Sequence, residues 1–360
     1  MAEANELISF IASMTGEGNL RVEENLGEGF VRLRVAEAER RQAKHDIQHV
    51  EDIVTEMLRN ARDAHASAMY IATMKEGGER TLLFLDNGCG IPADMQERIF
   101  DARVTSKLET MKMDRWGVHG RGMALYSIRE NAEDARVMAS APGLGSSFRV
   151  VVDTDRLPER ADQSTWPDAR RDENRVWTCV KGPHNIIRTA CEFALEEQPG
   201  CEVYLGSPAE IAATLYAHAS GLLDTQQLLF IDSETALPIV SRLGFAADAA
   251  DFMRIADSLG IQISERTAHR ILSGAIKPVR SVSSRLMRKR VPADAPAAVD
   301  LTRDRRGLKI AADDLDSFSR AVERDFTDLA ERYYLTLSSD PKVRVTRDAI
   351  TVTIPIQNVE

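Results

Sequence analysis

The sequence predicts an α+β fold. Three features predict it: an amphipathic helix over residues 46–64, two apolar strands at 69–73 and 81–85, and a second strand pair at 136–140 and 147–153. The chain has 360 residues, of which 43% are apolar and 28% charged, so it has enough apolar material for packed cores and is not wholly disordered. A prior of roughly 150 residues per domain gives two or three domains.

The charge and the cysteines exclude several classes of protein. A formal net charge of −10 argues against a protein that coats nucleic acid over its whole surface, although it is compatible with a local basic patch. The four cysteines form no CxxC pair and no His cluster has zinc-ligand spacing, so we expect neither a disulfide framework nor a structural zinc. The N-terminal residues lack the pattern of a secretory signal, and no stretch approaches the ~18 apolar residues of a membrane span. We therefore expect a cytoplasmic protein without membrane contact.

The elements of the first half follow from local patterns. We expect residues 1–45 to form a helical lead-in, because the part of this segment that follows Val22 is highly charged. The helix over 46–64 is predicted by an apolar stripe with spacings of three and four, made of Ile47, Val50, Ile53, Val54, Met57, Leu58 and Ala61. Residues 86–122 are rich in glycine and charge, which indicates mainly loop, and a helix follows at 123–131.

Polar segments divide the second half. We expect a linker at 155–175, an α/β middle segment at 176–245, a basic helical region at 246–310 and a helix with a C-terminal β-hairpin at 311–360. The middle segment contains strands at 176–180 and 201–205, and helices at 186–196 and 208–220. The basic region contains two short helices around Gly260 and a second linker at 291–300, the final helix covers 315–335, and the hairpin turns at Arg347-Asp348.

The first candidate site lies on the helix 46–64. Glu56, Asn60 and Asp63 stand at i, i+4 and i+7 and share a face that is offset from the apolar stripe. An asparagine oxygen can complete the ligand shell of Mg²⁺, and a glutamate can order or deprotonate an attacking water. Taken alone, this cluster is more typical of an ordinary solvated helix face, because exposed glutamate and asparagine are common.

The second candidate site is the run Asp86-Asn87-Gly88-Cys89-Gly90 after an apolar strand. Alternate glycines let backbone approach a flat ligand closely, and the Asp86 carboxylate can accept a hydrogen bond from an exocyclic amino group such as that of adenine. The same residues also make a tight turn, which is the structural alternative.

The third candidate site is the run Gly117-Val118-His119-Gly120-Arg121-Gly122 before a predicted helix. Glycines at a helix N-terminus let free N–H groups and the positive end of the helix dipole meet a phosphate, although many such runs are plain loops. A dinucleotide-binding fingerprint is disfavoured because it follows a strand within a short βαβ unit, and the absence of GxxxxGK[ST] excludes a P-loop.

The three clusters together resemble one family. The run Glu56–Ala64 resembles the N box of the GHKL ATPases, which include gyrase, the ninety-kilodalton heat-shock chaperones, histidine kinases and mismatch-repair ATPases. Asp86–Gly90 is similar to the G1 box, Gly117–Gly122 to the G2 box, and Gly143–Phe148 to the closing glycine–hydroxyl–strand element. The boxes are 30 and 31 residues apart, close to the spacing of that family. The resemblance implies a Bergerat-type α/β sandwich ATPase domain at residues 46–154.

The resemblance also implies roles for the matching residues. Glu56 would polarise the attacking water, Asn60 would bind the Mg²⁺ that bridges the phosphates, and Asp63 would be a structural partner. Asp86, helped by Ser146 through water, would read the adenine amino group. The other nucleotide-binding positions would be Gly88, Gly90 and Ile91 near the base, with Gly117, Gly120, Arg121 and Gly122 near the phosphates.

Residues from about 93 to 120 would form a lid over the nucleotide. Thr105-Ser106-Lys107 resembles the lid tripeptide of mismatch-repair and type II topoisomerase relatives, so Lys107 is the expected cation at the γ-phosphate. A solvated lysine is the alternative. The implied ligands are ATP, ADP and Mg²⁺, and lid closure would drive a conformational change or formation of a homodimer.

A basic region lies near the C-terminus. Residues 266–310 contain twelve Lys or Arg and three acids, a net charge of +9 within an acidic chain. The segment 252–272 suggests a helix-turn-helix, with Phe252, Ile255 and Leu259 on one apolar face and Ser264 as the N-cap of the second helix. This charge is compatible with binding of a nucleic-acid backbone, but a solvated helix face or a patch that docks on an acidic surface of the same chain is the more typical explanation.

Three functions stay open from the sequence. The first is a Mg²⁺-dependent ATPase, the second an ATP-gated DNA-binding regulator with little turnover, and the third a protein kinase of the histidine-kinase type that acts in trans. A histidine kinase carries its phosphoacceptor histidine on a dimerising hairpin well upstream, whereas only 59 residues precede Asn60 and His45 lies on the lead-in to the same helix. Glu56 at the start of the N box also favours water as the acceptor.

Overall fold

The computed structural model divides the chain into two units, residues 1–290 and 291–360, which we describe separately. The structure describes residues 22–35, 37–106, 112–114, 117–119, 122–160, 162–171, 177–197, 200–222, 231, 233–288, 301–303, 309–311, 318–319, 322, 326, 335–337, 341–345 and 350–358.

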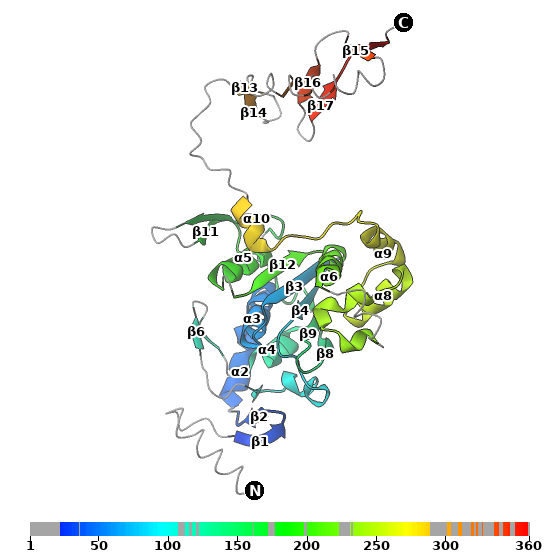
Figure 1. Cartoon of the computed structure of the whole chain (residues 1–360). Helices are drawn as coiled ribbons and strands as arrows, with labels where there is room; N and C mark the ends of the chain where they lie inside the picture. The colour runs from blue at the N-terminus through cyan, green and yellow to red at the C-terminus, as the bar shows by residue number, and fades with distance from the viewer. Residues whose placement is uncertain are drawn as a thin grey trace. The chain divides into compact units, whose positions relative to one another are not determined.

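A five-stranded mixed sheet forms the centre of the first unit (Figure 1). Its strand order is β12-β3-β4-β9-β8. Strand β12 runs parallel to β3, and the other neighbours are antiparallel. The strands span β3 (Ala68–Glu76), β4 (Glu79–Asp86), β8 (Asp134–Ser140), β9 (Ser146–Asp153) and β12 (Glu202–Gly206).

One face of this sheet is covered by the helices α3 (Val50–Asp63), α4 (Ala124–Asn131), α5 (Ile186–Glu196) and α10 (Val282–Arg288). Side chains alternate along each strand, so that Ile71 and Phe84 point to this layer and pack with Leu58 and Phe193 in one apolar core. The buried stripe of α3 contains the apolar residues that predicted the helix, except Ile47, which precedes the first residue of α3. The inward face of the helix is thus confirmed.

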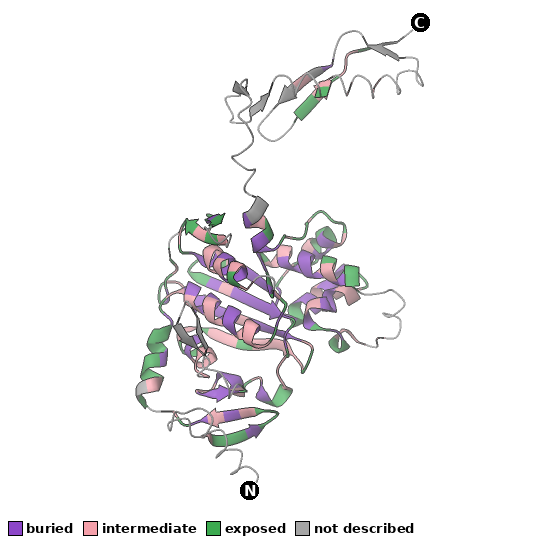
Figure 2. Ribbon diagram, turned by 60° about the vertical axis from the view of Figure 1, so that its left-hand side comes forward, coloured by how far each residue is buried: buried purple, intermediate pink, exposed green. Residues whose placement is uncertain are grey.

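The opposite face of the sheet is also covered, by α6 (Pro208–Leu222), η3 (Glu234–Ala236), η4 (Ile239–Phe245), α8 (Ala249–Ser258) and α9 (Glu265–Leu272). Tyr70, Leu83 and Leu85 point to this second layer and form a separate apolar core with it. Figure 2 shows buried residues along the strands and on the helix faces that meet them. The sheet therefore lies between two helical layers. Among the described residues, no helix combines the length and the apolar character of a membrane span.

Smaller elements flank the central sheet. Strands β1 (Val22–Gly27), β2 (Phe30–Leu33) and β5 (Val104–Thr105) form a three-stranded sheet, followed by α2 (Glu37–Asp46). The others are η1 (Ala93–Met95), η2 (Arg98–Phe100), and the pairs β6 (Lys112–Asp114) with β7 (Gly117–His119) and β10 (Asp168–Arg171) with β11 (Trp177–Lys181).

The helical lead-in predicted for residues 1–45 is wrong over residues 22–33, which form a β-hairpin. Gly27, Glu28 and Gly29 all have positive φ, and this turn geometry is costly in a helix. Leu26, Val31 and Leu33 are buried, whereas the charged residues between them stay at the surface. Charge alone favoured a solvated helix here, but glycine turn chemistry and alternation decide the structure. A helix does follow, as α2.

The middle segment joins the central sheet. The predicted strand–helix–strand at 176–205 forms as β11, α5 and β12, but β12 pairs with β3 and α5 packs on α3. The stretch predicted as a linker is bonded at both ends: the backbone N–H of Val50 donates to the Pro158 carbonyl at 3.2 Å, and buried Asn185 donates to the Asp162 and Thr165 carbonyls. The strands β3, β4, β8 and β9 and the later β12 thus belong to one sheet.

The C-terminal part confirms some expectations and corrects one. Two helices do flank Gly260, as α8 and α9. The basic helical region does not continue to residue 310, because β13 (Leu301–Arg303) pairs with β14 (Lys309–Ala311). The predicted C-terminal hairpin forms as β16 (Lys342–Val345) and β17 (Ile350–Thr353), and β15 (Leu335–Leu337) pairs with β18 (Ile356–Asn358). Most of the predicted helix 315–335 and all of the second linker lie outside the described residues.

Ser147 tests the contact between the sheet and its second helical layer. Its hydroxyl is fully buried and donates to the Leu259 carbonyl at 2.7 Å. We expect Ser147→Ala to lower the free energy of unfolding by about 1–3 kcal/mol, because it leaves a buried carbonyl without its donor. Urea denaturation measures this. Ser258→Ala removes an exposed hydroxyl that bonds within its own helix, so it is the matched control and should change the free energy by less than about 0.5 kcal/mol; equal effects of the two variants would contradict this account.

Candidate functional site

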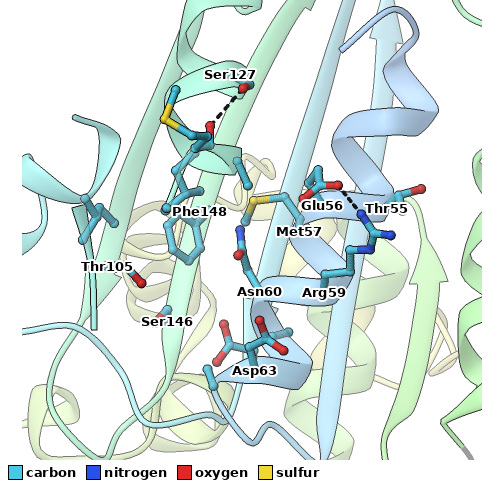
Figure 3. A pocket seen from close by; sticks show the side chains of 18 of the residues that line it. Thr55, Glu56, Met57, Arg59, Asn60, Asp63, Thr105, Ser127, Ser146 and Phe148 are labelled. Atoms are coloured by element: carbon cyan, nitrogen blue, oxygen red, sulfur yellow. Dashed lines mark hydrogen bonds and ion pairs between the residues drawn. The ribbon is translucent and has the colours of Figure 1, made fainter. Parts of the chain in front are cut away.

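A cavity of about 1160 Å³ opens beside α3, between this helix, the ends of β4 and β9, and the start of α4 (Figure 3). It is a size that accommodates a nucleotide-sized ligand. The predicted site residues that line it are Glu56, Asn60, Asp63, Asp86, Gly90, Ile91, Gly122 and Ser146. The fold therefore brings residues of the first two sequence clusters, the last glycine of the third and Ser146 of the closing element to one cavity.

The helix α3 carries one wall of the cavity. It begins with a capping box, in which the Asp52 carboxylate accepts from the His49 backbone N–H at 2.9 Å. One turn further, the Glu56 carboxylate accepts a hydrogen bond from the Arg59 guanidinium at 2.6 Å. Asn60 follows, and its amide nitrogen is buried and has no hydrogen-bond partner among the described residues. An amide that the fold does not use is what a ligand-binding asparagine requires.

Asp86 ends strand β4 and also lines the cavity. Its side chain is only 5% exposed, and one carboxylate oxygen accepts from the Gly88 backbone N–H at 2.8 Å. Strand register places Ser146 directly across from it on β9. The buried carboxylate and this hydroxyl are the polar pair at the closed end of the cavity.

Ser140, which the sequence patterns did not single out, organises this end. Its hydroxyl lies 2.9 Å from the Gly145 carbonyl, to which it donates, and 3.0 Å from the Ser146 hydroxyl. It also accepts from the Ile91 backbone N–H at 2.8 Å. One hydroxyl therefore links the loop after Asp86 to the β8–β9 turn. A serine at a strand end carries no distinctive sequence signal, and only the pairing of β8 with β9 reveals its position.

The glycines of the loop after Asp86 are required by packing within the protein. A Cβ on Gly88 would lie 2.7 Å from the Ala64 carbonyl oxygen, and one on Gly90 would lie 1.9 Å from the Ala141 carbonyl oxygen. Gly90 also has a φ of +70°. The loop is further held by the Cys89 N–H, which donates to the Ala64 carbonyl at 2.9 Å. Gly88 itself does not line the cavity. It contributes to the site through its N–H group, which donates to the Asp86 carboxylate.

The third cluster is only partly placed by the structure. Gly117 begins strand β7 and pairs with Asp114 on β6, so it lies in a strand pair and not in the expected loop, and its role at a phosphate stays a prediction. Gly122, with a φ of +66°, lies just before α4, and its carbonyl accepts from the Arg103 N–H at 2.8 Å. Lys107, Gly120 and Arg121 lie outside the described residues.

The electrostatics of the described wall are dominated by ion pairs. Three arginines line the cavity, and each has a carboxylate partner: Arg59 with Glu56, Arg160 with Asp52 and Arg188 with Glu192. Behind the sheet end, burial raises the pKa of Cys201 to about 12, and the carboxylates of Glu197 and Asp86 add to the effect. That thiol stays protonated and is unsuited to nucleophilic chemistry.

The comparison with known families agrees with this geometry. Residues 45–156 match the family described as histidine kinase-, DNA gyrase B-, and HSP90-like ATPases. These residues form a GHKL ATPase domain. The resemblance read from the sequence boxes is thereby confirmed, and the match supports ATP binding and ATPase-type activity in general terms. The GHKL domain contains α3, α4 and four strands of the central sheet, whereas α5 and β12 follow it in the chain.

The N-terminal region is similar to several curated relatives, all bearing the name DNA mismatch repair protein MutL. The protein of Heliobacterium modesticaldum is 41% identical over 80 residues, which cover 21% of this chain and 12% of the relative. That of Aquifex aeolicus is 38% identical over 81 residues, 21% of this chain and 18% of the relative. That of Allorhizobium ampelinum is 34% identical over 104 residues, 29% of this chain and 16% of the relative. The alignments thus span less than a fifth of the length of these relatives.

Ser140 offers a test of the GHKL cavity that leaves every predicted ligand contact in place. We expect Ser140→Ala to weaken adenine-nucleotide affinity roughly 10-fold, because the Ile91 N–H loses its acceptor and the loop after Asp86 loses its link to β9. Isothermal titration with ADP measures the affinity. The control is Ser127→Ala on α4, whose hydroxyl bonds only within its own helix. An unchanged affinity in the Ser140 variant would show that this network does not support the site.

Proposed function

We propose that this chain is a Mg²⁺-dependent ATPase of the GHKL class. The observation that carries the proposal is the arrangement of one cavity, with Glu56 and Asn60 a turn apart on one wall and buried Asp86 opposite Ser146 at the closed end. This arrangement separates an adenine-reading end from a hydrolytic end, and the family of the domain supports a nucleotide as the ligand.

At the closed end, Asp86 reads the adenine. A buried carboxylate accepts strongly from an exocyclic amino group, because the competing water has been removed. Its bond to the Gly88 N–H fixes the orientation of the group, and Ser146 supports the contact through water. Gly90 and Ile91 border the base. A guanine presents a carbonyl oxygen at the equivalent position, which a carboxylate disfavours.

Asn60 would hold Mg²⁺, which would supply positive charge to the phosphates of the bound nucleotide. The residues fit this ion in three respects: Asn60 carries a side-chain oxygen on the cavity wall, its amide nitrogen has no hydrogen-bond acceptor among the described residues, and the cavity has space for phosphate and water ligands. The arginines of the described wall are already paired with carboxylates. Charge balance for a triphosphate therefore depends on the metal and on cations of the lid, for which Lys107 and Arg121 are the proposed residues.

Glu56 polarises the attacking water, so water rather than a protein side chain accepts the phosphoryl group. The segment from about 93 to 120 closes over the nucleotide as a lid, with Gly117, Gly120 and Gly122 near the phosphates. Closure is coupled to a conformational change or to homodimer formation. This ATP-driven cycle would be the link between the domain and the rest of the chain.

A test of hydrolysis is Glu56→Gln. We expect kcat for ATP to fall roughly 10²- to 10⁴-fold, because an amide is a poor base, while ATP affinity changes by less than about threefold. Phosphate release with Mg²⁺ gives kcat, and calorimetry gives the affinity. Glu192→Gln removes another carboxylate of the same cavity that is paired with an arginine, and it should turn over normally. Failure of the folded wild type to bind ATP would refute the proposal, and turnover by Glu56→Gln at the wild-type rate would refute the role of Glu56.

A second candidate function, DNA binding gated by ATP, is favoured by the outer surface of α9. The helix buries Ala268 and Ile271 against the second layer, and Ser264 caps its N-terminus by accepting from the Thr267 N–H. Its exposed cations are Arg266 and Arg270. Two further exposed cations, Lys277 and Arg280, lie in the segment that follows the helix. A row of exposed cations beside a capped helix suits contact with a phosphate backbone. The printed name of the relatives, a DNA mismatch repair protein, also supports DNA as the partner.

The double variant R266Q/R270Q tests this surface. We expect it to weaken binding of a fluorescent DNA duplex and to lower the salt slope of log K by about two, because about two phosphate contacts are lost. Arg156→Gln, which removes an exposed arginine of the segment after β9, is the matched control and should bind like the wild type. Anisotropy across a salt series, with and without ATP, measures both quantities. Wild-type affinity and slope in the double variant would exclude this surface.

A further inference from the structure

The cavity wall contains an ion pair that the roles assigned above do not use. Arg59 lies one turn from Glu56 on α3, and its guanidinium donates to the Glu56 carboxylate at 2.6 Å (Figure 3). The Arg59 side chain is 6% exposed, whereas the Glu56 side chain is 21% exposed. The cation is therefore more buried than its carboxylate partner, and both residues line the cavity.

Burying a guanidinium is costly unless a carboxylate pairs with it closely. The fold holds Arg59 inside although nothing in the packing of an amphipathic helix requires a cation at this position, where the apolar stripe continues through Leu58 and Ala61. The planar guanidinium also fixes the orientation of its carboxylate partner, whereas a solvated glutamate has no fixed orientation. A glutamate with several rotamers is poorly suited to aim at one water molecule.

We propose that Arg59 is a positioning residue for ATP hydrolysis that acts through Glu56. Its guanidinium holds the Glu56 carboxylate charged and in one orientation at the edge of the cavity, ready to order the attacking water. This inference rests on the proposed ATPase function. Arg59 makes no contact with the nucleotide itself, so it contributes to kcat and not to nucleotide affinity.

Arg62 provides the contrast on the same helix. It stands three residues after Arg59 and does not line the cavity itself; its guanidinium pairs with Glu197 at 3.1 Å and with the cavity-lining Asp63 at 3.6 Å. The two arginines therefore share a helix, a side-chain type and a carboxylate partner. They differ in whether that partner is Glu56.

The experiment compares kcat and KM for ATP in the wild type, Arg59→Met, Arg59→Lys, Arg62→Met, Glu56→Gln and the double variant E56Q/R59M. Methionine keeps most of the apolar length of arginine, and thermal unfolding of each variant checks the fold. We expect Arg59→Met to lower kcat roughly 10- to 100-fold with KM within about threefold of the wild type. Arg59→Lys should recover part of the loss, and Arg62→Met should behave as the wild type.

The double variant decides whether Arg59 acts through Glu56. If it does, E56Q/R59M is no slower than Glu56→Gln alone, because the second substitution has nothing left to remove. Losses that multiply would overturn the inference, as would a rise in KM larger than the fall in kcat, which indicates direct phosphate contact. A faster Arg59→Met would overturn it too, because the pair would then restrain Glu56. A wild type without turnover refutes the ATPase function itself, whereas normal turnover in Arg59→Met refutes only this inference.

Discussion

The position of the Asp86 carboxylate is the constraint on which the site depends. It is buried at the end of β4, a strand flanked by β3 and β9 and therefore held from both sides. The loop that follows is bonded to the end of α3 through Cys89 and Ala64 and to the β8–β9 turn through Gly143. The helix that carries Glu56 and Asn60 and the strand that carries Ser146 are thus located relative to one carboxylate. Small shifts of any of these elements would change the shape of the cavity.

The two helical layers explain why this end of the sheet is rigid. The strands that form the cavity end are packed from one side by α3 and α4 and from the other by the layer that contains α8 and α9. Ser147 shows the second contact directly, because it follows Ser146 on β9 and its hydroxyl reaches the Leu259 carbonyl. Successive residues of one strand therefore serve the cavity and the outer layer. A binding site on such a sheet gains precision from packing on the face away from the ligand.

Local patterns predicted those parts of the structure that depend on local physics. The stripe on α3 and the hairpin of β3 with β4 follow from periodicity and turn residues, and the shared face of Glu56 and Asn60 follows from helix geometry. The pairing of β12 with β3 joins residues more than a hundred positions apart, and periodicity carries no information about such partners. For the same reason Ser140 was missed, since its role comes from three groups brought near it by the β8–β9 turn. The hairpin at 22–33 was missed because charge was weighed above its glycine turn.

The family match ends before the packed part of the first unit does. The residues just beyond the match therefore connect the ATPase domain to the helices that follow it. The match ends at residue 156, yet the next residues are bonded to the start of α3: the Pro158 carbonyl accepts from Val50, and buried Glu51 accepts from the Arg160 N–H. This stretch then contacts the start of α5 through Asn185, and Trp166 lies under the Arg285 guanidinium of α10 at 3.8 Å. A continuous set of contacts therefore runs from the N-terminus of the helix that carries Glu56 to the last described helix of the first unit. Because packed interfaces transmit displacement better than solvated linkers do, a movement of α3 upon nucleotide binding would be passed along this stretch toward α10.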